Sequence, residues 1–175
     1  MKRKIFIKLI GGLGNQLFQY ACAKNLALEL NGTLHIDDKT GFIFDNIFKR
    51  KKALPKNLDY NKIKPLDLIC FYFLFILKKI FFKKKTFFNI GNQIIVDETV
   101  ENKFIKNFFE KTKNYKKIYL IGFFQSEKYF FQNKKNITKK ILKNKINNLN
   151  IEKIKKKIKR NSVFVGIRMF EEAPN

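Results

Sequence analysis

Hydrophobic positions in the first 38 residues follow the order strand, glycine loop, helix, strand. Residues 4–10 (KIFIKLI) are mostly β-branched or aromatic and stop at a glycine, which predicts a largely buried strand. Asn15 can cap a helix over residues 16–30, where apolar side chains recur at helical spacing. Residues 33–36 predict a second strand. A strand, helix and strand in so short a stretch form a βαβ unit, which is typical of a parallel α/β sheet.

The pattern is less regular in the middle of the chain and becomes clear again toward its end. Pro55 and Pro65 predict loops, and Ser126 is placed to cap a helix that begins at residue 127. The remaining expected elements are strands over residues 94–96, 117–124 and 162–167, and helices over residues 101–111, 134–146 and 151–159.

This order of elements predicts the fold class α/β, with a Rossmann-like parallel sheet in an N-terminal domain. We expect that domain to cover residues 1–160 and to carry lysine-rich helices at its end. The strand at 162–167 starts a unit but has no helix after it. We therefore expect residues 161–175 to be the first strand of an incomplete second domain, so that the chain is truncated there.

One apolar stretch, residues 68–77 (LICFYFLFIL), stands next to several lysines. Its ten residues are too few for a spanning helix, which needs about twenty. Aromatic side chains mixed with lysines could rest on an anionic membrane surface. A buried helix or strand flanked by solvated lysines is the favoured interpretation, and peripheral membrane contact is the alternative.

The charge of the chain is strongly positive, with 38 Lys and Arg against 14 Asp and Glu and a net charge of +24. Such an excess is typical of proteins that bind polyanions. However, only four of the cations are Arg, the residue that base and phosphate recognition favours. The lysines accompany many Asn, Ile, Phe and Tyr residues, all specified by A/T-rich codons. A coding bias therefore explains much of the charge, and we expect no nucleic-acid partner.

The cysteines and the histidine predict structural roles. Cys22 and Cys70 lie in apolar stretches without a CxxC pair, so both are expected to be buried thiols. His35, alone in a strand, is expected to pack in the core. Lys8 and the glycine loop interrupt the first apolar run, which argues against a secretory signal. These features predict a cytoplasmic protein, with peripheral contact at the inner face of the plasma membrane as the alternative.

The strongest chemical signal is the segment GGLGNQLFQY at residues 11–20, between the first strand and the first helix. Glycines let a backbone approach a ligand closely, and a helix N-terminus offers free N–H groups to an anion such as a diphosphate. A dinucleotide fingerprint would place Leu17 where a third glycine is needed, and a Walker A loop would need Gly-Lys-Ser/Thr. Asn15 and Gln16 add amides that can bind phosphate or sugar hydroxyls. A tight turn without a ligand is the alternative.

Other polar residues are weaker candidates. Asp37 and Asp38 could ligate a metal, but adjacent strand residues point to opposite faces, so a carboxylate that caps the next turn is favoured. Gln125, Ser126 and Glu127 could contact hydroxyls of an acceptor, or Ser126 could simply cap its helix. Three carboxylates are conceivable general bases, and no spacing selects among them: Glu127, Glu171 and Glu172.

Three ordered blocks carry a family resemblance. Residues 11–21 read GGLGNQLFQYA, residues 122–130 read GFFQSEKYF, and residues 163–168 read VFVGIR. They resemble the N-terminal signature, the G-[YF]-[WF]-Q-S-x-x-Y-F block and the strand before the HxRRxD-type motif of glycosyltransferase family 11. Asp37 also matches a frequent acidic position. The chain thus resembles the N-terminal portion of the bacterial and animal α-1,2-fucosyltransferases.

The resemblance implies a two-domain GT-B fold that takes L-fucose from GDP-fucose without a metal. The reaction would invert the anomeric carbon and join fucose to the 2-hydroxyl of a β-galactoside in a surface glycan. The glycine loop, through Gly12, Gly14, Asn15 and Gln16, would reach the donor diphosphate or fucose. Arg168 would contact the β-phosphate and stabilise the leaving GDP, a role that suits a bidentate, always-charged donor.

The third block departs from the family pattern. Gly166 stands where the family often has histidine, Met169 replaces the second arginine, and Glu171 replaces aspartate. For Arg168 the alternative is a surface salt bridge to Glu171 or Glu172. Family members are also longer, so we expect this chain to cover the acceptor-side domain and to be inactive alone. The alternatives are a non-enzymatic basic protein that binds anionic membrane or nucleic acid, and a degenerate remnant.

Overall fold

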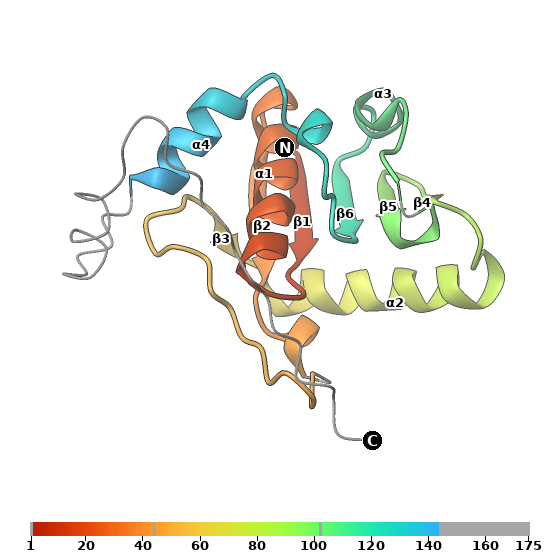
Figure 1. Ribbon diagram of the computed structural model, residues 1–175. Coiled ribbons are helices and arrows are strands. Elements are labelled where there is room, and N and C mark those ends of the chain that lie inside the picture. The colour runs from red at the N-terminus through yellow and green to blue at the C-terminus, as the bar shows by residue number, and fades with distance from the viewer. Residues whose placement is uncertain (1, 44, 102, 144–175) are drawn as a thin grey trace, which may run out of the picture.

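A six-stranded sheet organises the chain in a computed structural model that describes residues 2–43, 45–101 and 103–143 (Figure 1). The strand order is β3-β2-β1-β6-β5-β4, and neighbours are parallel except for the edge pair β4 and β5. The predicted α/β class with a mostly parallel sheet is confirmed, and the arrangement is compatible with a Rossmann-like domain. The strands are β1 (Lys4–Lys8), β2 (Thr33–Asp37), β3 (Asn61–Lys62), β4 (Phe87–Ile90), β5 (Gln93–Asp97) and β6 (Lys117–Ile121).

Helices cover both faces of the sheet because its central strands are apolar on both faces. In β1, Ile5 and Ile7 join the core beneath α1, whereas Phe6 joins the core beneath α2. The helix α2 runs across the strand direction in the view of Figure 1. The helices are α1 (Leu13–Glu29), α2 (Pro65–Phe81), α3 (Phe108–Thr112) and α4 (Lys134–Leu142), with 3₁₀ turns at Thr40–Phe42, Glu98–Val100 and Glu127–Tyr129.

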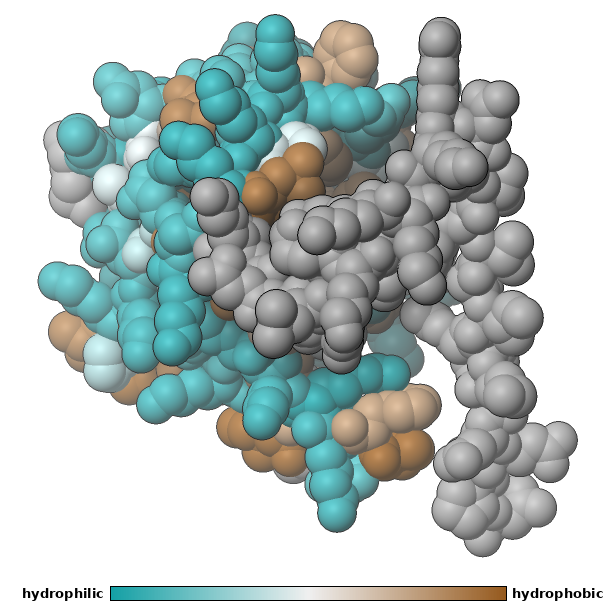
Figure 2. All heavy atoms as spheres, turned by 60° about the vertical axis from the view of Figure 1, so that its left-hand side comes forward, coloured by the Kyte–Doolittle hydropathy of each residue, from teal (hydrophilic) through white to brown (hydrophobic). Residues whose placement is uncertain are grey.

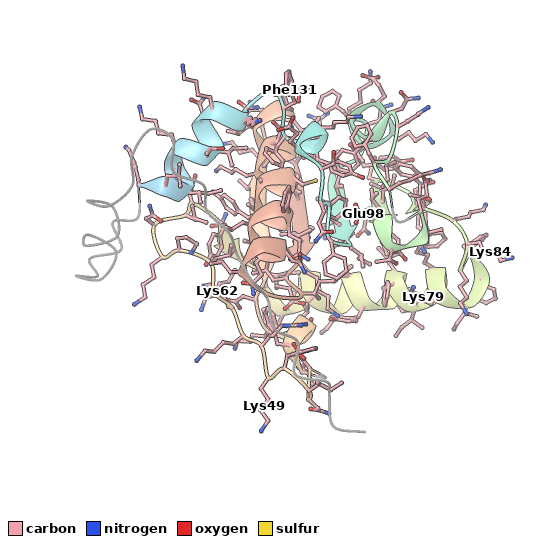
Figure 3. The ribbon with its side chains drawn as sticks, in the orientation of Figure 1. Lys49, Lys62, Lys79, Lys84, Glu98 and Phe131 are labelled. Carbon is pink, nitrogen blue, oxygen red and sulfur yellow. The ribbon has the colours of Figure 1, made fainter. Side chains whose placement is uncertain are left out.

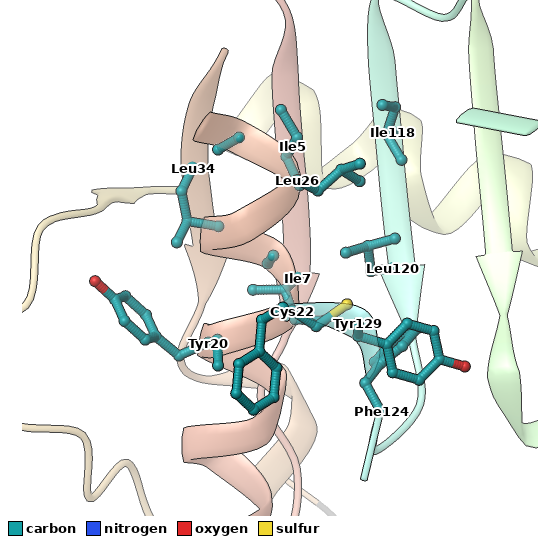
Figure 4. Close-up of a cluster of buried hydrophobic side chains, with 14 of the residues drawn as sticks. Ile5, Ile7, Tyr20, Cys22, Leu26, Leu34, Ile118, Leu120, Phe124 and Tyr129 are labelled. Carbon is teal, nitrogen blue, oxygen red and sulfur yellow. The ribbon is translucent and has the colours of Figure 1, made fainter. Parts of the chain in front are cut away.

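The larger core lies between α1 and the sheet (Figure 4). Cys22 is fully buried there, as predicted, and burial raises the pKa of its thiol well above the ordinary value. Side chains of α1 meet every second residue of the strands, as the two-residue period of a strand requires. The fully or almost fully buried members labelled in Figure 4 include Ile5, Ile7, Tyr20, Leu26, Leu34, Ile118 and Leu120.

The smaller core lies under α2 and is built on stacked aromatic rings. Tyr119 stands between Phe6 and Phe71, with ring centroids 4.7 Å and 5.2 Å away and nearly parallel planes. The apolar run at 68–77 is thus helical, but only one face of it is buried. Cys70 lies on the other face and is exposed, so the prediction of a second buried thiol was wrong.

Two helix starts differ from the sequence prediction. The helix α1 begins at Leu13 with Gly12 as its N-cap, so Asn15 lies inside the first turn and does not cap it. Pro65 is the first residue of α2 and not part of a loop. Its fixed φ suits the first helical position, where a backbone N–H would have no helical partner anyway.

Several other boundaries were predicted too generously. The helix expected over 101–111 is only α3, which follows Asn107 in a left-handed conformation with φ of 57°. The helix expected from residue 127 is a single 3₁₀ turn, and the strand expected over 117–124 ends with β6. The edge strands β3 and β4 were not predicted. The expected helix at 151–159, the strand at 162–167 and the second domain lie outside the described residues.

A buried ion pair fixes α2 to the sheet. The ammonium of Lys78 donates to Asp97 at 2.8 Å, and both side chains are fully buried. Thr99 donates a further hydrogen bond to the same carboxylate. Burial alone would raise the pKa of Asp97, but the hydrogen bonds from Lys78 and Thr99 hold it below its ordinary value. The carboxylate therefore stays charged and depends on Lys78.

We expect Lys78→Met to lower the free energy of unfolding by about 3–5 kcal/mol, because it leaves a buried carboxylate without its main partner. Urea unfolding measures this loss. The control is Lys79→Met, which removes a half-exposed ammonium 3.5 Å from Asp97 and should cost less than about 1 kcal/mol. Adding Asp97→Asn to Lys78→Met should restore part of the stability. Equal stability of the two single variants would contradict this role for the pair.

Candidate functional site

The candidate site lies where β1 and β6 end side by side. These strands are parallel neighbours in register from Lys4 opposite Lys117 to Ile7 opposite Leu120. Their carboxyl ends therefore reach the same edge of the sheet, which is where open α/β sheets bind ligands. The glycine loop follows β1, and the second of the three sequence blocks follows β6. The fold thus brings two blocks separated by about a hundred residues of sequence to one edge.

Of the three glycines in the loop, the local backbone requires glycine at one position and not at the other two. Gly11 has φ of +76°, and a Cβ there would lie 2.5 Å from the side-chain nitrogen of Asn15, so the turn itself needs glycine. A Cβ at Gly12 or Gly14 would meet nothing within 4 Å. The fold does not require glycine at these two positions. Their missing side chains leave the backbone open to an approaching group.

The N-terminus of α1 lies in this opening, and its first N–H groups have no partner among the residues that the structure describes. Gly12 provides no side-chain cap, and the first turn has no acidic residue. The first intrahelical bond runs from Gln16 N–H to the carbonyl of Gly12 at 3.1 Å. Within the described residues, no hydrogen bond reaches the N–H groups of Leu13, Gly14 or Asn15. These donors, at the positive end of a 17-residue helix, favour an anion.

Asn15 joins the two sequence blocks. Its side-chain oxygen accepts a hydrogen bond from the amide of Gln125 at 2.5 Å. Gln125 itself is exposed and Asn15 is partly exposed. The structure therefore places three predicted site residues, Gly12, Gly14 and Asn15, together at this edge, and adds Gln125 beside them.

Gln16 has a different position from the one expected. Its side chain is fully buried, and its amide donates to the carbonyls of Gly11 at 2.9 Å and Lys51 at 3.0 Å. Its oxygen accepts from the N–H of Ala53 at 2.8 Å. The amide thus connects the glycine loop to the segment around residues 51–53. We assign Gln16 to the support of the loop, because the main chain already uses both ends of its amide.

Gln19 was missed in the sequence and is central to the site. It is fully buried, accepts from the N–H of Ile10 at 3.1 Å and donates to the carbonyl of Gly122 at 3.0 Å. One side chain thereby ties the end of β1 to the end of β6. A detectable signal existed: Gln16 and Gln19 are spaced by three along the helix, which places both amides on one face.

Glu98 is the second residue that sequence reasoning missed (Figure 3). Its buried carboxylate accepts the N–H groups of Phe123 and Phe124, both at 2.9 Å. The turn it holds is unusual, because Gly122 has φ of +137° and Phe124 has φ of +52°. A Cβ at Gly122 would lie 2.7 Å from Glu98. Glu98 therefore fixes the start of the second block and with it the position of Gln125.

Asp37 and Asp38 have structural partners. Asp37 accepts from the N–H groups of Lys39 at 3.1 Å and Thr40 at 3.0 Å, and from the Thr40 hydroxyl. This confirms the prediction that one of the pair caps the following turn. Asp38 lies 3.4 Å from the ammonium of Lys52. Among the described residues, no group of three or more His, Cys, Asp or Glu side chains could hold a metal ion.

The other candidate residues have structural roles: one caps a turn, one forms an ion pair and one packs in the core. Ser126 accepts from the N–H of Lys128 at 3.3 Å and so caps the 3₁₀ turn. Glu127 is exposed and pairs with the ammonium of Lys134. His35 is buried beside Phe6, as predicted, and burial lowers its pKa. Arg168, Glu171 and Glu172 lie outside the described residues.

A small cavity of about 100 Å³ adjoins the glycine loop, between α2 and the ends of β1 and β6. Lys8, Ile10, Tyr72 and Gly122 are among its lining residues. Pockets that enclose a whole small-molecule ligand usually measure about 300–1,000 Å³. The cavity can therefore hold only a fragment of such a ligand.

We expect Glu98→Ala to lower the free energy of unfolding by about 1–3 kcal/mol, because it leaves the buried N–H of Phe124 and the partly buried N–H of Phe123 without this acceptor. Glu98→Gln should keep most of the stability, since its amide oxygen can still accept from Phe123 and Phe124. Urea unfolding measures the loss, and hydrogen exchange at those two amides locates it. Equal losses in the two variants, or unchanged exchange at both amides, would contradict this role.

Comparison with models of known protein families, with curated proteins and with solved structures finds no match in any of the three.

Proposed function

We propose that the glycine loop and the N-terminus of α1 bind the diphosphate of a sugar nucleotide. We further propose that the chain is the N-terminal part of a GT-B glycosyltransferase similar to family 11. The observation that carries the first proposal is the uncapped helix start, where the N–H groups of Leu13, Gly14 and Asn15 follow or belong to two glycines that the fold does not require, Gly12 and Gly14. Free donors and an open backbone together suit a phosphate oxygen better than they suit a plain turn.

The choice of sugar nucleotide rests on the resemblance. GDP-fucose is the donor that the blocks at 11–21 and 122–130 imply, and a β-galactoside is the acceptor. The contact between Asn15 and Gln125 supports reading these blocks as one site, because it joins a residue of each. Amides at that place can bind the hydroxyls of a sugar as donors and as acceptors.

The reaction would be a single displacement at the anomeric carbon of fucose. The 2-hydroxyl oxygen of the acceptor forms the new bond while the bond from that carbon to the β-phosphate oxygen breaks, so the configuration inverts. The acceptor proton passes to a general base, for which Glu127, Glu171 and Glu172 are the candidates. Negative charge grows on the departing GDP, where the helix N–H groups and Arg168 would stabilise it.

Gly14→Ala separates binding from folding. The added methyl group meets nothing in the protein and alanine favours a helix, so we expect an unchanged or raised melting temperature. The same methyl group would occupy the space through which a diphosphate approaches. We therefore expect the affinity for GDP-fucose to fall by about tenfold or more, which corresponds to about 1.4 kcal/mol. Isothermal titration calorimetry on the full-length protein measures it.

The matched control is Gly32→Ala, whose Cβ would lie 2.9 Å from the carbonyl oxygen of Arg3. That change should lower the melting temperature and leave the affinity of the folded protein intact. ADP-glucose, which differs from GDP-fucose in both base and sugar, serves as the competitor that tests selectivity for the donor. Wild-type affinity in Gly14→Ala would overturn the diphosphate site, and equal binding of the two nucleotides would overturn the assignment to GDP-fucose.

The rate of fucose transfer tests the two side chains that would contact GDP-fucose. We expect Asn15→Ala and Arg168→Ala in the full-length enzyme each to reduce fucose transfer by roughly 10²-fold or more, the usual effect of removing a donor that stabilises developing charge. Asn89→Ala, an exposed asparagine on β4, is the control and should transfer normally. Near-normal turnover in both test variants would show that these residues do not form the site.

A further inference from the structure

The helix α2 is apolar on both of its long faces. Its buried face repeats at helical spacing and packs on the sheet through Asp67, Phe71, Leu74 and Lys78. A helix at the surface of a protein ordinarily turns polar residues to the outside. Here the outer face is apolar as well, although nothing in the described part of the chain covers it.

The outer face is a continuous line of large hydrophobic side chains, which we name the α2 stripe. Its members follow one another at intervals of three or four residues, with Phe81 at the end of the helix. Each is more than half exposed: Leu66 78%, Ile69 65%, Phe73 62%, Ile76 54%, Ile80 65% and Phe81 68%. Contiguous apolar surface of this kind marks a contact with a partner or a membrane.

The surroundings of the α2 stripe are positively charged. Between residues 60 and 96 the sequence has a single acidic residue, Asp67. Asp67 is buried and neutralised by Lys4 at 3.0 Å and Lys117 at 2.9 Å. Figure 3 shows Lys62 near one end of the helix and Lys79 and Lys84 toward the other. The exposed lysines of this region are Lys62, Lys64, Lys79, Lys83, Lys84 and Lys85.

We propose that the α2 stripe lies on the surface of an anionic lipid bilayer, with its side chains at the boundary of headgroups and acyl chains. Hydrophobic side chains flanked by lysines are what such a surface attracts, through apolar burial and through the attraction of each nearby lysine to anionic headgroups. None of the helices in the described residues has the length and apolar character needed to cross a membrane. The helix α2 therefore lies along the surface.

Charge also decides against a second copy of the chain as the occupant. Each chain carries a net charge of +24, and pairing two stripes would bring their lysines together. Like charges at an interface oppose association. The side of the molecule that carries α4 is different, because hydrophilic side chains dominate it where it is visible in Figure 2. Exposed lysines therefore occur over much of the surface, whereas the combination of lysines with a line of exposed apolar side chains is a feature of α2.

A single tryptophan can report this contact, because the chain has none of its own. We expect Phe73→Trp in the full chain to show a blue-shifted emission with vesicles of 70% phosphatidylcholine and 30% phosphatidylglycerol. Pure phosphatidylcholine vesicles should leave the emission unchanged, and so should the anionic vesicles in 0.5 M salt, where charges are screened. Lipids brominated near the headgroup should quench the same tryptophan.

The control is Phe131→Trp, at a side chain that is 68% exposed and labelled on the opposite side of the molecule from α2 in Figure 3. It should show no shift. Equal shifts in both variants, or no shift in Phe73→Trp, would overturn the proposal. A blue shift that grows with protein concentration in the absence of vesicles would also overturn it and would identify a second copy as the occupant.

Charge reversal tests the lysines independently of the reporter. Replacing Lys83, Lys84 and Lys85 by Glu should reduce co-sedimentation with the anionic vesicles by at least tenfold. Replacing Lys103, Lys106 and Lys135 by Glu changes the net charge equally, at exposed positions outside the stripe, and should have a much smaller effect. Equal losses of co-sedimentation in the two triple variants would show that binding depends on net charge alone and would overturn the role of the lysines beside the α2 stripe. Binding of GDP-fucose is measured separately, so either proposal can fail alone.

Discussion

The carboxamide of Gln19 holds the ends of β1 and β6 together, and the geometry of the candidate site depends on it. It accepts from Ile10 and donates to Gly122, so both hydrogen-bonding atoms of one buried side chain are used on two different strands. Both loops of the site begin at these two points. Without the amide, the partly buried N–H of Ile10 and the buried carbonyl of Gly122 would lack this partner, and leaving a buried polar group unpaired costs more than the bond contributes when made. The amide therefore fixes the spacing of the loops as well as stabilising the fold.

Around Gln19, some residues hold the backbone of the two loops in place and others remain exposed at the site. Gln16 and Glu98 are buried, and their polar atoms form hydrogen bonds with the backbone of the two loops. Gly11 provides the left-handed turn that brings the chain from β1 into α1. Because these residues hold the loop in place, Gly12, Gly14 and Asn15 can remain accessible to a ligand at the start of the helix. Preorganised N–H groups of this kind need no rearrangement when an anion arrives.

The sequence predicted the parts of the fold that local patterns encode. The first strand, first helix and second strand follow from periodicity, and so does the position of Gly12, Gly14 and Asn15 at the sheet edge. The edge strand β3 has only two residues, and β4 depends on pairing with β5, so neither leaves a clear local pattern. Cys70 was misjudged because α2 is apolar on both faces, which hides the direction of burial. Glu98 and Gln19 act across long sequence separations, and no local signal reports their partners.

The helix α2 is linked through side chains to the carboxyl ends of β2 and β1. Tyr72 of α2 shares a hydrogen bond with the hydroxyl of Thr40, which in turn bonds Asp37 at the end of β2. The ammonium of Lys8, at the end of β1, lies 5.3 Å from the centre of the Tyr72 ring. The buried pair of Lys78 and Asp97 anchors the same helix further along. A bilayer contact through the α2 stripe would therefore hold the carboxyl edge of the sheet at a fixed orientation to the membrane.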